Sequence, residues 1–225
     1  MDVHYKMGAY PLFSSLQATF SLGHIVGIVG ANGSGKSTLL RIIAGLCSIQ
    51  HGSITTSIHS LGFVPATPFL YPMLTVKENL MVVAQLKKIG AQNRLQAIEH
   101  ALALCSLMEY QSILFNKLSD GLKKRACIAS QLVHQPQLLI LDEPCAKLDP
   151  HQRQQLWELL NTLRQPNRLI LFSSHHPQEM SALCDEMYLL QAGKLEAAHK
   201  ENFAQTLYQK ILSSQELSLE PDVSQ

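Results

Sequence analysis

Eight consecutive residues near the start of the chain have the types and spacing of a phosphate-binding loop. They follow the apolar segment 25–29, precede Thr38, and read Gly30-Ala31-Asn32-Gly33-Ser34-Gly35-Lys36-Ser37. Between a strand and a helix, the pattern G-x-x-x-x-G-K-[ST] turns backbone N–H groups toward phosphate oxygens, and the start of the helix adds its positive dipole end. Lys36 would place a charge on the β- and γ-phosphates, and the Ser37 hydroxyl would bind Mg²⁺. This segment therefore predicts a site for a nucleoside triphosphate and Mg²⁺.

A glycine-rich turn can also do no more than join a strand to a helix. The full pattern, however, arises by chance in well under about 1% of chains of this length. The apolar run before it and the helical pattern after it make a chance match rarer still. Phosphate binding is the better interpretation of residues 30–38.

Two carboxylates supply the next part of a predicted site. Asp142 and Glu143 directly follow the apolar run 138–141, which has the composition of a central parallel strand. Ligands of parallel sheets sit at the carboxyl ends of the strands. There Asp142 would join the Mg²⁺ shell, and Glu143 could polarise an attacking water as a general base. Alone, an acidic strand end would mean little; together with the phosphate loop it predicts hydrolysis of the nucleotide.

The order of these segments resembles a known family over about residues 8–200, the ATP-binding cassette (ABC) ATPases that drive membrane transporters. Three more segments carry the resemblance, and they look like the family's signature, D-loop and switch-histidine motifs. They read Leu118-Ser119-Asp120-Gly121-Leu122-Lys123-Lys124-Arg125, Leu148-Asp149-Pro150 and Ser173-Ser174-His175. Segments 71–80 and 183–194 look most like the single-cassette subunits of export-type transporters, including multidrug and haem-export relatives.

The resemblance implies a mechanism and partners. Two cassettes would close head to tail around ATP, so that Ser119, Gly121 and Asp149 of one cassette meet the nucleotide held by the other. His175 would hold the γ-phosphate and the water; taken alone, His175 and His176 would be read as a surface pair. The expected protein is an ATP-hydrolysing exporter subunit, peripheral on the cytoplasmic face of the membrane. Its partners would be a transmembrane permease subunit and a second cassette, identical or different.

Three departures from the family's pattern affect this expectation. Ala66 stands where the family usually has a glutamine that meets metal and membrane partner, although Thr67 or a water could substitute. Asp120 replaces a glycine of the signature, which we expect to reduce activity without abolishing it. The residue that would stack on adenine aligns with Met7, and its neighbours Tyr5 and Tyr10 are the nearby aromatic side chains.

The elements that must position these residues fit an α/β fold, a P-loop NTPase core with a mostly parallel sheet. We expect an N-terminal antiparallel β-subdomain within residues 1–22 and an inserted helical subdomain at about 75–135, in an ATPase domain of residues 1–200. Residues 201–225 would form a C-terminal helix and tail, partly disordered. The expected strands are 61–64, 138–141, 169–173, 187–190 and 194–197. The expected helices are 36–44, one starting at a Thr75–Glu78 capping box, 93–108, 122–134, 151–164 and 178–184.

Composition excludes several other classes of protein. The net charge is +1, and the longest basic cluster is residues 123–125, so we expect no nucleic-acid partner. The five cysteines are scattered without a C-x-x-C, as in a reduced cytosolic protein. No signal-peptide pattern opens the chain and no 18 apolar residues run together, so we expect it not to cross a membrane by itself.

Two rival functions fit the same motifs. One is a soluble, non-transport ABC ATPase that acts in assembly or regulation. The other is a nucleotide-dependent binding module with weak hydrolysis, which Ala66 and Asp120 would favour. The transported substrate does not follow from the sequence, because in this architecture selectivity belongs to the permease.

Overall fold

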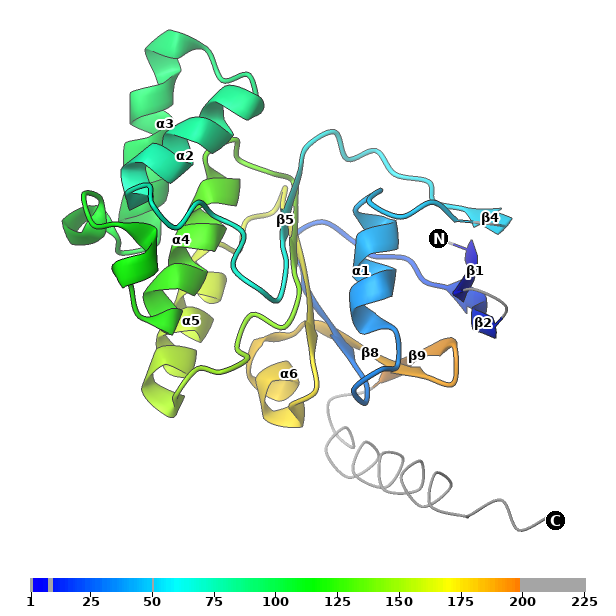
Figure 1. Ribbon diagram of the computed structural model, residues 1–225. Helices are drawn as coiled ribbons and strands as arrows, with labels where there is room; N and C mark the ends of the chain where they lie inside the picture. Colours follow the sequence, from blue (N-terminus) through cyan, green and yellow to red (C-terminus); the bar gives the residue numbers. More distant parts are fainter. Residues whose placement is uncertain (1, 8–9, 50, 199–225) are drawn as a thin grey trace, which may run out of the picture.

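The computed structural model of the chain describes residues 2–7, 10–49 and 51–198 (Figure 1). The predicted C-terminal helix and tail at 201–225 lie outside the described residues. Within them, the main sheet has six strands in the order β5-β6-β7-β3-β8-β9. All neighbours are parallel except β8 and β9, which pair antiparallel. The strands are β3 (Ile25–Val29), β5 (Leu61–Val64), β6 (Leu138–Leu141), β7 (Leu169–Ser174), β8 (Glu186–Gln191) and β9 (Lys194–Ala198). The predicted mostly parallel sheet is confirmed.

A second, antiparallel sheet joins the N-terminal segment to the loop after the first helix. Its order in the described chain is β2-β1-β4, from β1 (Asp2–Met7), β2 (Tyr10–Gln17) and β4 (His51–Ser53). Figure 1 shows it on the α1 side of the molecule. The expected β-subdomain is present. Strand β4 was missed, because Gly52 signals a turn in sequence but adopts φ 99° inside a short exposed strand.

The central strands β3, β6 and β7 are buried along their whole length. Their residues are apolar almost throughout, which is typical of parallel strands covered on both faces. The register pairs Ile25 with Ile170 and Leu139 with the same Ile170. The three carboxyl ends therefore reach the same edge of the sheet.

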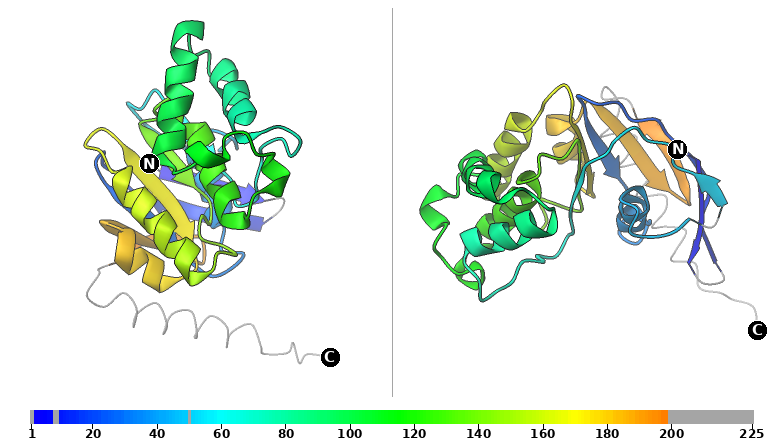
Figure 2. Two further views of the ribbon diagram at one scale, coloured as in Figure 1. Left: turned by 90° about the vertical axis from the view of Figure 1, so that its left-hand side faces the viewer. Right: turned by 90° about the horizontal axis from the view of Figure 1, so that it is seen from above.

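Helices cover the two faces of the main sheet unequally (Figures 1 and 2). Helix α1 (Lys36–Ile43) lies between the two sheets, whereas α2 (Val76–Leu86), α3 (Ala91–Leu104) and α4 (Asp120–Leu132) form a lobe on the other side. Helix α5 (Pro150–Thr162) lies beside α4, and α6 (Pro177–Leu183) follows β7. The lobe occupies the predicted helical insertion, whose bounds of 75–135 remain our proposal.

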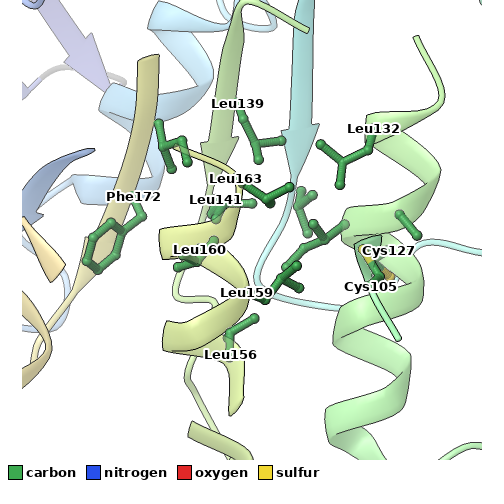
Figure 3. Packing of buried hydrophobic residues seen from close by; sticks show 14 of the residues in the cluster. Cys105, Cys127, Leu132, Leu139, Leu141, Leu156, Leu159, Leu160, Leu163 and Phe172 are labelled. Carbon is green, nitrogen blue, oxygen red and sulfur yellow. The ribbon is translucent and has the colours of Figure 1, made fainter. Parts of the chain in front are cut away.

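The core has two clusters of buried apolar residues, one on each side of the main sheet. The larger cluster holds the lobe to the sheet, and Figure 3 shows Leu139 and Leu141 of β6 facing leucines of α5 and Leu132 of α4. The smaller cluster packs α1 and Phe13 of β2 against the opposite face. Both clusters include residues of β3, β6 and β7, so the strands that lead into the site loops are packed on both faces.

One helix start agrees with the prediction, and two other helix ends differ from it for local reasons. Helix α2 starts at the predicted capping box, in which Thr75 Oγ1 accepts from Glu78 N and the Glu78 carboxylate accepts from Thr75 N. Helix α4 begins at Asp120 and not at Leu122, because Ser119 caps it by accepting from Leu122 N. Helix α3 ends at Leu104, short of the predicted end at 108, and 3₁₀ turns follow at Met108–Tyr110 and Phe115–Lys117.

Candidate nucleotide site

The phosphate loop connects β3 to α1, as predicted, and two of its glycines are sterically required. A Cβ on Gly30 would lie 2.5 Å from the carbonyl oxygen of Leu190. Gly35 has φ 99°, and a Cβ there would lie 2.9 Å from the ring of Phe13. Among the described residues no side chain caps α1. Its first N–H groups are therefore available to an anion.

Lys36 at the start of α1 is buried, with 4% of its surface exposed. Its Nζ donates to the carbonyl oxygens of Gly30 at 2.8 Å and Ala31 at 3.0 Å. Burial lowers the pKa of the Lys36 ammonium, while the Glu143 and Asp142 carboxylates act to raise it. These hydrogen bonds to carbonyl oxygens hold the ammonium inside the loop. A bound phosphate would replace one or more of the carbonyl oxygens as an acceptor for the ammonium.

Asp142 follows β6, and its carboxylate accepts hydrogen bonds from hydroxyl groups of two other elements. Its Oδ1 accepts from Ser37 Oγ at 3.0 Å and from Ser173 Oγ, at the end of β7, at 2.8 Å. Asp142 is buried, so these oxygens form a compact, hard donor set beside the phosphate loop. Mg²⁺ prefers one or two such protein oxygens together with phosphate and water. Ser37 and Asp142 fit a magnesium ion.

Glu143 adopts a backbone conformation that residues with a Cβ rarely take. Its φ is 44°, and its N–H donates to Ser173 Oγ at 3.0 Å. Such strained residues cluster at functional sites because the surroundings must hold them. The bend brings Glu143 Oε1 to 3.8 Å from Lys36 Nζ and 3.6 Å from His175 Nδ1. Glu143 also lines a cavity of about 250 Å³ with the phosphate-loop residues Asn32, Gly33, Gly35, Lys36, Ser37 and Thr38.

His175 directly follows β7 and is partly exposed on the same edge. Its ring centroid lies 4.0 Å from that of His176, whose pKa is lowered by burial and by the neighbouring His175. Two hydrogen bonds of Ser174 hold this segment in place. Ser174 Oγ donates to the buried Glu179 of α6 and accepts from His176 N. Glu179 pairs at 3.5 Å with Arg153 of α5. The switch segment is thereby fixed to two helices.

The signature and D-loop residues lie away from this cavity. Ser119, Gly121 and Asp149 line a separate cavity of about 590 Å³ at the starts of α4 and α5. It shares no lining residue with the phosphate-loop cavity among the residues described. Asp149 caps α5 by accepting from Gln152 N at 2.8 Å. A single chain therefore brings Lys36, Ser37, Asp142, Glu143 and His175 together and leaves Ser119, Gly121 and Asp149 apart.

Two of the three departures have a structural setting that can be described. The side chain of Asp120 is 68% exposed and lies 4.0 Å from Lys123 Nζ, so its charge faces solvent. Ala66 is exposed on the loop after β5, and its carbonyl oxygen accepts from Lys124 Nζ. The side chains of Tyr5, Met7 and Tyr10, named for adenine stacking, lie outside those that the structure describes.

Two residues of this region were not predicted as functional. Ser173 joins Asp142 to the backbone of Glu143, and Lys124 reaches the Ala66 loop from the signature helix. Ser173 could have been found from its place in the switch motif, one strand away from the carboxylates. Lys124 was named only within the signature segment and the basic cluster 123–125, with no role of its own.

The fold and this cavity define a nucleotide-binding domain of the P-loop class. A sequence profile described as "ABC transporter" matches residues 13–146, and the chain belongs to this family. The chain is 35% identical over 196 residues to the "Probable multidrug ABC transporter ATP-binding protein YbhF" of Escherichia coli, covering 82% of this chain and 34% of that protein. It is 32% identical over 204 residues to "Nod factor export ATP-binding protein I" of Rhizobium etli, covering 86% and 65%.

The chain spans about a third of the length of the first relative and 65% of the length of the second, so both relatives extend beyond the part that matches. Solved structures agree on the fold. The cbiO1 subunit of the Clostridium perfringens complex cbiONQ superposes with a TM-score of 0.81 at 23% identity, covering 95% of this chain and 91% of that one. An ATP-binding subunit of another ABC transporter gives 0.81 at 24%, covering 94% and 97%. The predicted family and fold class are confirmed.

Proposed function

We propose that the chain hydrolyses ATP as the nucleotide-binding subunit of a membrane exporter. The observation that carries this proposal is the convergence of Lys36, Ser37, Asp142, Glu143 and His175 at one edge of the sheet. Two relatives with names that include "multidrug" and "export" support the direction of transport. The non-transport alternative has no such support among the relatives described above.

We propose the following roles for the hydrolytic step. Lys36 and the free N–H groups of α1 hold the phosphates, and His175 orients the γ-phosphate and the water. Glu143 accepts a proton from the attacking water while the oxygen of that water forms a bond to the γ-phosphorus. The bond between the γ-phosphorus and the β–γ bridging oxygen breaks, and ADP leaves. A magnesium ion held by Ser37 and Asp142 would neutralise charge on the phosphates.

A second cassette would complete the site. Ser119 caps α4 and Gly121 lies in its first turn, and the positive dipole end of a helix suits the γ-phosphate of a partner's nucleotide. Their cavity is separate from the phosphate loop in this chain, which supports contact in trans. We therefore propose a head-to-tail pair in which each phosphate loop faces the other chain's signature.

An exposed apolar patch supports a membrane partner. Within the described residues, no helix has the length and apolar character to span a bilayer. On the lobe, however, Tyr71 and Met73 are 58% and 71% exposed, with Phe69 and Ile113 also exposed. Asn116 Nδ2 contacts Met73 Sδ, and Val76 N donates to Ile113 O, so the loop and the lobe form one surface. We propose that this docking patch, Phe69, Tyr71, Met73 and Ile113, binds a permease on the cytoplasmic side.

Mixing two inactive variants tests the head-to-tail arrangement. Lys36→Ala removes the phosphate charge, and Ser119→Arg blocks the signature contact. In a mixed dimer one site carries both changes and the other carries neither. Equal amounts should recover about a quarter of wild-type turnover, because half the dimers are mixed and each has one intact site. Inactivity of the mixture, with active wild type, would contradict a site shared between copies of this chain.

Co-purification tests the docking patch. The chain is co-expressed with a multi-span protein encoded beside its gene and is recovered from detergent extracts. Met73→Glu should lose the complex, because a carboxylate on an apolar contact cannot be desolvated cheaply. Leu22→Glu is the matched control, since Leu22 is also exposed but precedes β3, away from the lobe. Equal recovery of both variants would place the contact elsewhere.

A further inference from the structure

The signature helix carries a lysine that points into the protein. Lys124 of α4 is only 6% exposed, and its Nζ donates to the carbonyl oxygen of Ala66 at 2.9 Å. Its neighbour Lys123 is partly exposed and pairs with the exposed Asp120. The adjacent lysines therefore have different environments, one near solvent and one beneath the loop after β5.

Burial of this ammonium is not a stabilising arrangement. Within the described residues, the hydrogen bond to Ala66 is the one that Lys124 Nζ makes. A single neutral acceptor offsets little of the desolvation of a cation. Burial accordingly lowers the pKa of Lys124, while the carboxylates Asp142 and Glu143 act to raise it. A costly group of this kind, placed near the hydrolytic carboxylates, points to a role other than stability.

The loop that Lys124 contacts connects the hydrolytic site with the lobe surface. Val64, at the end of β5, accepts through its carbonyl oxygen from Asp142 N at 2.8 Å. Two residues later, Ala66 is bound to α4 through Lys124. The same segment then continues to Phe69, Tyr71 and Met73 of the docking patch. Because Ala66 has only a methyl group, its side chain offers no polar contact, and the link to α4 runs through its backbone.

We propose that Lys124 is a positioning residue that ties the Ala66 loop to the signature helix. When the second cassette closes on Ser119, α4 and the loop then move together, and the motion reaches the docking patch. This inference rests on the proposed function, because it needs closure of two cassettes. Lys124 thus links α4 to residue 66 through the backbone carbonyl of Ala66, because the methyl side chain of Ala66 cannot make a polar link.

The test compares Lys124→Met, Lys124→Gln and the control Lys123→Met by amide hydrogen exchange without nucleotide. Lys124→Met should raise exchange at Ala66 and Thr67 roughly tenfold, because this tie is lost, while residues 30–38 stay unchanged. Phe69 and Leu70 keep the backbone hydrogen bonds that they make to Cys127 of α4. Melting temperature should stay the same or rise, since methionine is not penalised by burial. Lys124→Gln keeps a donor and should fall between wild type and methionine. Lys123→Met should match wild type.

Turnover supplies the second readout. Lys124→Met should lower kcat about five- to tenfold with KM for ATP within about twofold, because the coupling and not the nucleotide contact is lost. Wild-type exchange at Ala66 and Thr67 in Lys124→Met would overturn the proposal. So would a lower melting temperature with faster exchange throughout, which would indicate a structural lysine. The exchange readout needs no turnover, so an inactive wild-type protein would contradict the proposed function separately.

Discussion

Oε1 of Glu143 lies 3.6 Å from Nδ1 of His175, across the ends of neighbouring strands. The unusual backbone of Glu143 and the serine-anchored end of β7 produce this approach together. His175 Nδ1 is buried and has no hydrogen bond within the described part of the chain. The imidazole is therefore held beside the Glu143 carboxylate, and its Nδ1 can still form a hydrogen bond to a ligand. This setting distinguishes His175 from a surface histidine.

We expect His175→Ala to lower kcat by about 10²-fold or more with little effect on ATP affinity, because the side chain acts on the γ-phosphate and water. His176→Ala is a close control, because it removes the neighbouring imidazole of the pair, whose pKa is lowered by burial and by His175, and leaves His175 in place. Steady-state hydrolysis and nucleotide titration of both variants check the prediction. Equal losses in the two variants would mean that the pair acts only through packing.

Ala66→Gln should raise permease-stimulated turnover more than basal turnover. Ser37, Asp142 and the phosphates can supply most of the metal shell without residue 66, so basal activity does not depend on it. A glutamine would add a side-chain contact to the backbone link through Lys124. The measurement is hydrolysis with and without the membrane subunit. Strong stimulation of wild type, unimproved by glutamine, would show that coupling already runs through other residues.

Thiol reactivity tests the packing of the larger core cluster, which contains Cys105, Cys127, Cys145 and Cys184. Burial raises the pKa of Cys105 to about 12 and of Cys145 to about 12, and it raises that of Cys127. A raised pKa leaves these thiols protonated and unreactive at pH 8, and Cys184 is also buried. Maleimide labelling followed by mass spectrometry should modify Cys47 alone in the native protein and all five in denaturant. Rapid native labelling of a second cysteine would show that the core opens.

The sequence was sufficient to predict those site residues whose position follows from the strand or helix next to them in the chain. Lys36 and Ser37 follow a strand and start a helix, and Asp142 and Glu143 end an apolar run, so the strand-end rule for parallel sheets brought them together. Side-chain direction and long-range bonding could not be read in the same way. Lys124 is one of three adjacent basic residues, and only the packing of α4 on the sheet selects it for burial. Ser173 stands in the switch motif, but its hydrogen bond to Asp142 follows only from the pairing of β7 with β6.

The central claim is that this chain hydrolyses ATP with Glu143 as the base, and Glu143→Gln tests it most directly. Glutamine keeps the size of the side chain but cannot accept the proton, so ATP should bind as in wild type. Turnover should fall roughly 10²- to 10⁴-fold, the usual contribution of a positioned base. With hydrolysis blocked, size-exclusion chromatography in ATP and Mg²⁺ should show a nucleotide-bound dimer that wild type does not accumulate. Wild-type turnover in Glu143→Gln would contradict the assignment.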